Sequence, residues 1–175
     1  ESSEKINIPP VDVLFTNPPW GKKVEPLERE RVSKKFAVHK SLDTSGIFLI
    51  ISRNLLKRES IYGMVLPESF FNVAAFEQAR SAMLNDDVLC IIDHGKAFSG
   101  LLTKAISFVS KKGDCSKSSR VICRSGGSEI FRTKSSFNKN PKSIINYYAD
   151  DNAEDVLAHI LDFPHVTLSG RARWA

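Results

Sequence analysis

The residues best suited to chemistry form one short segment, Asn17-Pro18-Pro19-Trp20, directly after the apolar run from Val11 to Phe15. This run has the composition of a buried β-strand, and two consecutive prolines cannot continue a sheet because they lack N–H donors. We therefore predict that the strand stops at Asn17. Because Asn17 precedes a proline, its backbone favours the extended region and its side chain stays near the carboxyl end of the strand. In open α/β sheets, ligands bind at that edge.

The segment offers two hydrogen-bond acceptors beside one flat ring. The side-chain oxygen of Asn17 accepts hydrogen bonds, and the Pro18 carbonyl has no partner in a sheet ladder. Two acceptors that hold both protons of an exocyclic amino group make its nitrogen a better nucleophile, so no ionisable general base is needed. Trp20 offers a face for stacking a planar ring. The pattern favours an amino group on a planar ring as substrate, and the alternative without chemistry is a rigid loop with a packed indole.

Composition and charge limit the class of protein. The chain has 175 residues, of which 42% are hydrophobic, which is enough to bury one core. No apolar run approaches the ~20 residues that span a bilayer, and the first residues do not resemble a signal peptide, so we expect a cytoplasmic protein without a membrane partner. The net charge of +5 favours a polyanionic partner.

The cysteines and histidines do not indicate a metal site. The three cysteines, Cys90, Cys115 and Cys123, are odd in number and lack CxxC or Cys/His ligand spacing. Neither a disulfide framework nor a structural metal is expected, and Cys90 is predicted to lie in the core. The four histidines are scattered, which is typical of surface residues.

The rest of the chain alternates helical and strand patterns. The predicted elements are helices over residues 45–57 (with Ser45 as N-cap), 70–84 and 154–161 (with Asp151 or Asn152 as N-cap), and strands over residues 61–66, 88–93, 105–110, 121–123, 129–132 and 144–148. The charged stretch 21–44 is expected to be a mobile loop with one helical turn near residues 27–35. This order predicts an α/β fold with a mainly parallel sheet. Strands 88–93 and 105–110 have no helix between them and are expected to form an antiparallel edge hairpin.

The Asn17 to Trp20 segment resembles motif IV, (Asn/Asp/Ser)-Pro-Pro-(Tyr/Phe/Trp), of amino-group methyltransferases that use S-adenosylmethionine. The likeness is strongest to the adenine-N6 DNA methyltransferases of restriction-modification systems, and covers roughly residues 11–112. It implies a partial Rossmann-like S-adenosylmethionine-dependent methyltransferase fold. Residues 1–112 would form the second half of the catalytic domain, and residues 113–175 would add short strands and a helix leading toward a missing C-terminal region.

The resemblance also implies roles for individual residues. Asn17, Pro18, Pro19 and Trp20 would form the catalytic segment, with Trp20 stacked on one face of a flipped adenine. Phe98, in Lys96-Ala97-Phe98-Ser99-Gly100, resembles the motif VIII aromatic that stacks on the other face. Asn17 and Phe48, in Gly46-Ile47-Phe48-Leu49, are assigned to the cofactor side, although Phe48 lies on an apolar helix face and is equally explained as a core residue.

One part of the family pattern is missing. The sequence lacks the glycine-rich cofactor loop and the acidic residue that holds the ribose, and Gly126-Gly127 cannot replace that loop because no helix evidently starts after it. We therefore expect the cofactor half of the site to come from missing residues or from another chain. The chain would be an excised fragment, one subunit of a split enzyme, or part of a longer protein.

The resemblance implies methyl transfer from S-adenosylmethionine to the N6 amino group of adenine in DNA, by a site-specific adenine-specific DNA methyltransferase. Two alternatives stay open. One is a methyltransferase acting on an RNA base or a protein glutamine, for which a second stacking aromatic such as Phe98 suits only the base. The other is a non-catalytic nucleic-acid-binding half-fold, which the missing cofactor loop favours and the intact Asn17 to Trp20 segment opposes.

Overall fold

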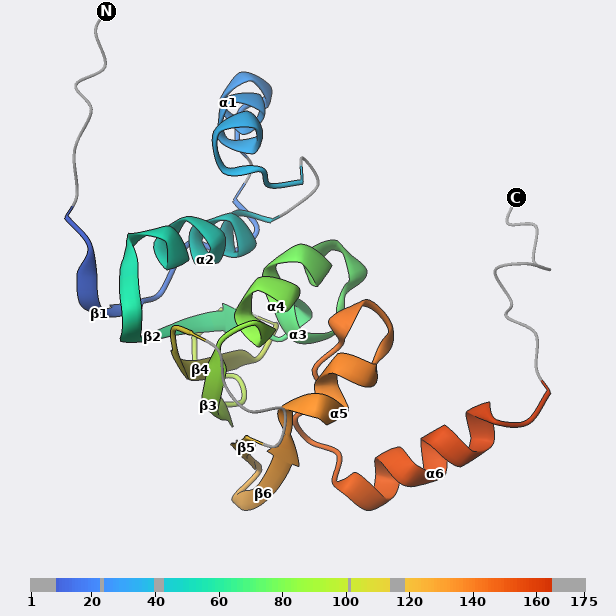
Figure 1. Cartoon of the computed structure of the whole chain (residues 1–175). Coiled ribbons are helices and arrows are strands. Elements are labelled where there is room, and N and C mark those ends of the chain that lie inside the picture. The colour runs from blue at the N-terminus through green and yellow to red at the C-terminus, as the bar shows by residue number, and fades with distance from the viewer. Residues whose placement is uncertain (1–8, 23, 40–42, 101, 114–118, 165–175) are drawn as a thin grey trace, which may run out of the picture.

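The computed structural model describes residues 9–22, 24–39, 43–100, 102–113 and 119–164, and these form one six-stranded sheet with helices packed on it (Figure 1). The elements in chain order are β1 (Val11–Thr16), α1 (Pro26–Phe36), α2 (Thr44–Leu55), β2 (Leu56–Pro67), α3 (Ser69–Asn72), η1 (Ala74–Phe76), α4 (Glu77–Leu84), β3 (Asp87–Asp93), β4 (Ala105–Lys111), β5 (Arg120–Ser125), β6 (Ser128–Thr133), α5 (Lys134–Lys139), η2 (Pro141–Ser143) and α6 (Asp151–Leu161).

The strand order is β1-β2-β4-β3-β5-β6. Strands β1, β2, β3 and β5 run in one direction, whereas β4 and β6 run in the opposite direction. The predicted α/β fold with a mainly parallel sheet is therefore confirmed. The antiparallel pairing of β3 with β4 is also confirmed, but this pair does not lie at the edge. Strand β4 lies between β2 and β3, and the hairpin of β5 and β6 forms the edge instead.

The central position of β4 is explained by its apolar pattern. Its buried residues Ile106 and Phe108 lie opposite Leu66 and Met64 of β2, which are also buried. Strand β3 covers the other side of β4 and contributes buried Ile91 opposite Phe108. The core lies between this face of the sheet and helices α2, α3 and α4 (Figure 1). A strand with two apolar neighbours loses more exposed apolar area than it would at an edge.

The opposite face of the sheet carries exposed apolar side chains. Val13 and Phe15 of β1 are each 61% exposed. The Phe15 ring lies over Gly63 of β2, where an added Cβ would come within 2.7 Å of a ring carbon. A hollow of about 360 Å³ opens beside Phe15 and Gly63 and continues to Val65 and Val109. The described helices thus cover only one face of the parallel pair β1 and β2, which in α/β proteins is usually covered on both.

The stretch after Trp20 contains a full helix where the sequence predicts one turn. Helix α1 starts with Pro26. Proline suits the first turn because an N–H at this position would have no acceptor within the helix. It carries Glu28 in its first turn and Lys34 and Lys35 in its last turn, which suits the helix dipole. An ion pair of 3.0 Å joins Lys34 to Glu30 one turn earlier. Val32 and Phe36 of α1 pack against the core, so apolar contacts and favourable charge placement both support this helix.

Two predicted helices begin or break at other residues than expected. Helix α2 starts at Thr44 because Asp43, and not Ser45, is the N-cap, and the Asp43 carboxylate accepts a 2.9 Å hydrogen bond from the Ser45 N–H. The helix predicted over 70–84 is divided into α3, η1 and α4. The division falls at Val73, whose backbone is extended, with φ of −84° and ψ of 134°.

The prediction of a strand over residues 144–148 is wrong. Ile145 and Tyr147 are buried, but the segment packs against α3 and does not join the sheet. The Ile145 N–H donates a 2.9 Å hydrogen bond to the Phe71 carbonyl. This bond gives the Ile145 N–H a partner outside any β-sheet. Helix α6 starts at Asp151, and Asp150 is its N-cap.

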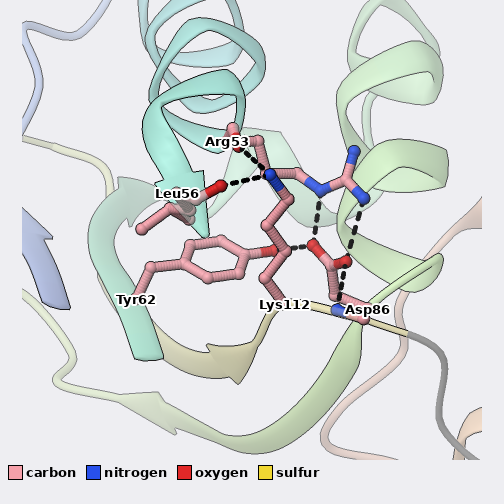
Figure 2. Close-up of polar contacts among 6 residues, drawn as sticks. Arg53, Leu56, Tyr62, Asp86 and Lys112 are labelled. Atoms are coloured by element: carbon pink, nitrogen blue, oxygen red, sulfur yellow. Dashed lines mark hydrogen bonds and ion pairs between the residues drawn. The ribbon is translucent and has the colours of Figure 1, made fainter. Parts of the chain in front are cut away.

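A buried carboxylate joins three elements at the end of the sheet where β3 begins (Figure 2). The Asp86 carboxylate accepts hydrogen bonds from both Nε and Nη2 of Arg53, the second of them at 2.9 Å. It also accepts hydrogen bonds from the Tyr62 hydroxyl at 2.6 Å and from the Gly113 N–H at 3.1 Å. The bidentate pairing and two further donors compensate for the desolvation of the Asp86 charge.

The C-terminal end of α2 is held at the same place. Lys112 Nζ donates to the carbonyl oxygens of Arg53 at 2.9 Å and Leu56 at 2.5 Å (Figure 2). A cation at this end satisfies free carbonyls and suits the helix dipole. Helix α2 is thereby fixed to the ends of β2 and β4, at the opposite end of the sheet from Asn17.

Candidate active site

The predicted catalytic segment lies at the carboxyl end of β1. Strand β1 ends at Thr16, and the residues from Asn17 to Pro19 belong to no helix or strand. Pro18 is buried, Asn17 is exposed, and Trp20 is half-buried. The Trp20 Nε1–H donates a 3.1 Å hydrogen bond to the Val65 carbonyl of the neighbouring strand β2. This bond fixes the edge of the indole against the sheet while the side chain keeps part of its surface exposed.

Phe98 comes from the connection between β3 and β4 and contacts Trp20. The two ring centroids are 5.5 Å apart and the ring planes make an angle of 77°, which is an edge-to-face contact. Phe98 is 39% exposed. The structure therefore brings together the two aromatic residues that the sequence assigns to base stacking, although 78 positions separate them in the chain.

A cavity of about 380 Å³ lies between these two loops, within the size range of small-molecule sites. Its lining residues are Asn17, Pro18, Pro19, Trp20, Phe98 and Ser99. Five of these six residues belong to the predicted catalytic and stacking set. The cavity offers an amide, backbone carbonyls and aromatic surface at the carboxyl edge of the sheet, which is where an α/β fold binds ligands.

The two rings do not form an open sandwich. A planar base stacked between parallel rings needs centroids about 7 Å apart, because each contact spans about 3.5 Å. The observed 5.5 Å edge-to-face contact leaves no room for that arrangement. The hydrogen bond from Trp20 to Val65 fixes one ring, whereas Phe98 lies between Gly95 and Gly100, which both have positive φ. Binding of a base between the rings thus requires Phe98 to turn.

Phe48 lies outside this cavity. Its neighbours Ile47 and Leu49 on α2 are buried in the core, whereas Phe48 is 42% exposed. Its exposure argues against a core role, and its assignment to the cofactor side stays a prediction. The residues that line the Asn17 cavity do not include it.

Sequence reasoning missed Asp93, the last residue of β3. Its carboxylate is 5% exposed and accepts four hydrogen bonds, from the Gly95 N–H at 2.7 Å, Ser125 Oγ at 3.1 Å, Lys104 Nζ at 3.3 Å and the Tyr147 hydroxyl at 3.3 Å. Burial acts to raise the pKa of Asp93, but the donors outweigh it and hold the pKa below its usual value. The signal available in the sequence was an apolar strand that ends in a carboxylate just before the Phe98 loop.

The described residues contain no group of three or more His, Cys, Asp or Glu side chains that could hold a metal ion. Cys123 is buried and Cys90 is half-buried, so Cys90 lies at the margin of the predicted core. Cys115 lies outside the described residues. Within the same ranges, no helix is long and apolar enough to cross a membrane.

Comparison with known proteins identifies the family. The family model described as Eco57I restriction-modification methylase matches residues 10–98, which include the Asn17 segment and Phe98. The chain belongs to this family. Members are methylases of restriction-modification systems, so the predicted resemblance to that class of methyltransferase is confirmed.

Among curated proteins, this Eco57I-family chain is similar to the type II methyltransferase M.VspI from Vibrio sp. (strain 343). The two are 40% identical over 163 residues. The alignment covers 93% of the chain and 40% of M.VspI, so the chain spans less than half of the length of that relative.

Solved structures of low sequence identity share the fold. A modification subunit assigned to a type I restriction enzyme from Vibrio vulnificus YJ016 matches with a TM-score of 0.63 and 14% identity, covering 86% of this chain and 40% of the other. A protein assigned to the class I S-adenosylmethionine-dependent methyltransferases from Listeria monocytogenes matches with a TM-score of 0.54 and 16% identity, covering 89% and 43%. The predicted methyltransferase fold is confirmed.

The residues of this Eco57I-family chain fit S-adenosylmethionine only in part. Asn17 offers an exposed amide and Phe48 an exposed ring. The sequence has neither the glycine-rich turn nor the ribose-binding carboxylate of the resemblance, and the Gly126-Gly127 turn joins β5 to β6 instead of leading into a helix. The described residues around Asn17 therefore do not form a complete cofactor pocket.

Proposed function

We propose that the chain forms the target-base half of an S-adenosylmethionine-dependent methyltransferase that modifies the N6 amino group of adenine in DNA, within a restriction-modification system. The observation that carries this proposal is the convergence of Asn17, Pro18, Trp20 and Phe98 on one cavity at the carboxyl edge of the sheet. Membership of the Eco57I methylase family supports the reaction class. The basic net charge of +5 suits a DNA partner.

In this proposal, the chain positions the amine and does not deprotonate it before transfer, and the proton that the methylated nitrogen loses passes to water. The Asn17 side-chain oxygen and the Pro18 carbonyl accept the two N6 protons, while Pro19 keeps the turn rigid and Trp20 stacks on the ring. S-adenosylmethionine, when bound, supplies an activated methyl group. Alignment of the amine with that group would then provide most of the rate enhancement, because the donor needs no further activation.

Stacking offsets the cost of extruding the adenine from the duplex. Extrusion costs a few kcal/mol, and each aromatic face contributes about 1–3 kcal/mol. The Trp20 face is held in place by its hydrogen bond to Val65, so a base meets a fixed surface on that side. Phe98 would complete the stack after turning away from its present contact with Trp20.

The cofactor half would come from residues outside this chain or from another chain. M.VspI is more than twice as long as the part that matches here. The exposed Val13 and Phe15, with the hollow beside them, form an apolar surface on the parallel pair β1 and β2. Parallel strands need cover on both faces, which makes this surface suitable for packing the remaining half of the fold.

A substitution at Asn17 tests the proposed function. In a methyltransferase that contains this chain in full length, Asn17→Ala should lower methyl transfer to DNA by orders of magnitude, because the amino group loses one of its two acceptors. DNA binding should be retained, since phosphate contacts carry most of the affinity. Incorporation of labelled methyl groups and a gel-shift assay measure the two quantities. Asn54→Ala, at an exposed position on α2, is the matched control. A rate unchanged by Asn17→Ala would contradict the mechanism.

The choice of acceptor can be tested with the same enzyme. The contact between Trp20 and Phe98 favours a base over a protein glutamine, because a second stacking ring serves a planar substrate. We expect transfer to adenine in DNA, and no transfer to a glutamine peptide. Transfer to RNA in preference to DNA would support the RNA alternative, and DNA binding without any transfer would support a non-catalytic half-fold.

A further inference from the structure

We propose that Asp93 is a positioning residue that holds the Phe98 loop, the connection between β3 and β4, in register with Trp20. The effect on catalysis rests on the proposed function. The positioning of the loop rests only on the contacts that Asp93 makes. Asp93 does not line the cavity that contains Asn17 and Phe98. It would therefore act through the loop and not on the substrate.

The carboxylate holds both ends of this loop. At the start, the Gly95 N–H donates to Asp93 at 2.7 Å, and Gly95 has a φ of +62° that turns the chain sharply. At the end, Lys104 Nζ donates to the same carboxylate at 3.3 Å. Two backbone hydrogen bonds of 2.9 Å close the base of the loop, from the His94 N–H to the Ala105 carbonyl and from the Ala105 N–H to the Gly95 carbonyl.

Lys104 connects the loop to the strand that anchors Trp20. Its Nζ lies 3.5 Å from the Glu68 carboxylate, and its carbonyl accepts a 3.0 Å hydrogen bond from the Glu68 N–H. Glu68 follows the end of β2, three residues after Val65, whose carbonyl accepts the Trp20 indole. The loop with Phe98 and the partner of Trp20 are thus fixed to each other through Lys104.

The remaining two donors come from elements outside the loop. Ser125 lies at the end of β5, and Tyr147 lies in the segment before α6. A carboxylate that is 5% exposed is costly unless it is fully hydrogen-bonded, and here three segments, the loop, β5 and the segment before α6, provide four donors. The base of the Phe98 loop is therefore rigid, while Phe98 itself, which is more exposed, is free to turn about this base.

Two variants test the proposal in the chain itself. Asp93→Asn removes the charge that holds Lys104, and Lys104→Met removes the other partner at a more exposed position that is tolerant of change. Both are made with Trp174→Phe, which leaves Trp20 as the one indole of the sequence.

Loss of a charged hydrogen bond should speed amide exchange at Gly95 about tenfold in Asp93→Asn. Acrylamide quenching of Trp20 fluorescence should increase in both variants because Phe98 packs against it less often.

Two controls separate positioning from general loss of structure. Ser125→Ala removes a donor to Asp93 outside the loop, and should leave Gly95 exchange and Trp20 quenching close to the parent values. Amide exchange at Phe108 in β4 reports the core and should stay unchanged in every variant. The proposal would be overturned if both test variants kept the Gly95 amide exchange rate and the Trp20 quenching of the parent. It would also be overturned if amide exchange at Phe108 accelerated as much as exchange at Gly95.

A DNA experiment separates this proposal from the proposed function. In the full-length methyltransferase, Asp93→Asn should reduce the fluorescence increase of 2-aminopurine at the target position and lower methyl transfer by about the same factor as Phe98→Ala. If the Trp20 and Gly95 readouts change but Asn17→Ala has no effect on transfer, the proposed function fails and the positioning role stands. If Asn17→Ala abolishes transfer while Asp93→Asn leaves Gly95 exchange parental, the positioning role fails alone.

Discussion

Trp20 uses two parts of its side chain for different purposes. The indole N–H is bonded to the Val65 carbonyl, and the ring contacts Phe98. A phenylalanine or tyrosine at this position would offer a face for stacking but not an indole N–H at the same place. The hydrogen bond to Val65 sets the orientation of the indole in the absence of a ligand. If Trp20 stacks on a base as proposed, preorganisation of this kind lowers the entropy cost of binding.

Trp20→Phe tests this orientation at the scale of one residue. The variant retains a ring but leaves the Val65 carbonyl without its donor, so the free energy of unfolding should fall by about 1 kcal/mol. Urea denaturation measures this change. In the full-length enzyme, extrusion of 2-aminopurine should be weaker than in the parent but stronger than in Trp20→Ala. Trp174→Phe is the control for loss of an indole elsewhere, and equal stability of Trp20→Phe and the parent would show that the hydrogen bond does not hold the ring.

At the scale of elements, two buried carboxylates fasten opposite ends of β3. Asp86 precedes the strand and binds Arg53, Tyr62 and Gly113, whereas Asp93 ends it and binds the Phe98 loop. The Asp86 cluster joins α2 to the sheet far from the cavity. The two clusters therefore allow stability and site geometry to be tested separately.

Asp86→Ala should be strongly destabilising. It leaves the Arg53 guanidinium and the buried Tyr62 hydroxyl without their shared acceptor, and breaking a buried pair in this way costs about 3 kcal/mol. Thermal or urea unfolding measures the loss. Asp87→Ala, at the next residue and only half-buried, should change stability by less than about 0.5 kcal/mol. Similar losses in both variants would contradict a specific role for Asp86.

The lowered pKa of Asp93 predicts acid sensitivity of the Phe98 loop. Because the folded-state pKa lies below the unfolded value, the stabilisation is complete above about pH 4 and is lost as the pH falls through the folded value. Trp20 fluorescence, followed from neutral to acid pH, should report this loss before global unfolding. The other charged or titratable groups that face the carboxylate are Lys104 and Tyr147, and Glu68 faces Lys104. Glu68→Gln is therefore the control, and it should retain the transition.

At the scale of the whole molecule, the described helices α2, α3 and α4 pack on one face of the sheet, and β1 presents exposed apolar side chains on the other face. The exposed side chains of β1 lie where a second layer of an α/β fold would pack. Helix α6 also carries exposed apolar residues, and Figure 1 shows it extending away from the sheet. Apolar surfaces of this kind usually mark sites of contact with other polypeptide.

Val13→Lys tests the importance of the uncovered face. In the isolated chain it should reduce self-association, measured by light scattering after size exclusion, because a charge now lies on the apolar surface. In the full-length methyltransferase it should impair binding of S-adenosylmethionine by disturbing the packing of the two halves. Val156→Lys on α6 has nearly the same exposure, 60% against 61%, and should leave cofactor binding unchanged. Equal effects of both variants would show that the uncovered face has no special role.

The sequence alone determined the features that depend on neighbouring residues. The end of β1 follows from the prolines after Asn17, and the buried strands follow from apolar runs such as 61–66 and 105–110. Local patterns were insufficient for α1, of which only Val32 and Phe36 pack against the core. They were misleading for residues 144–148, whose buried side chains pack on a helix. The candidate site was predicted to the extent that each of its residues lay in a recognisable motif.

Only the tertiary structure decided how distant segments meet. The insertion of β4 between β2 and β3, the contact of Trp20 with Phe98 and the hydrogen bonds from Ser125 and Tyr147 to Asp93 all join residues that are far apart in the chain. Such contacts depend on which strands become neighbours. An apolar pattern indicates that a strand is buried, but the partner of a strand without a short hairpin turn depends on the burial gained over the whole sheet. For that reason the sequence predicted a chemistry for the Asn17 segment, while only the fold determined the geometry around it.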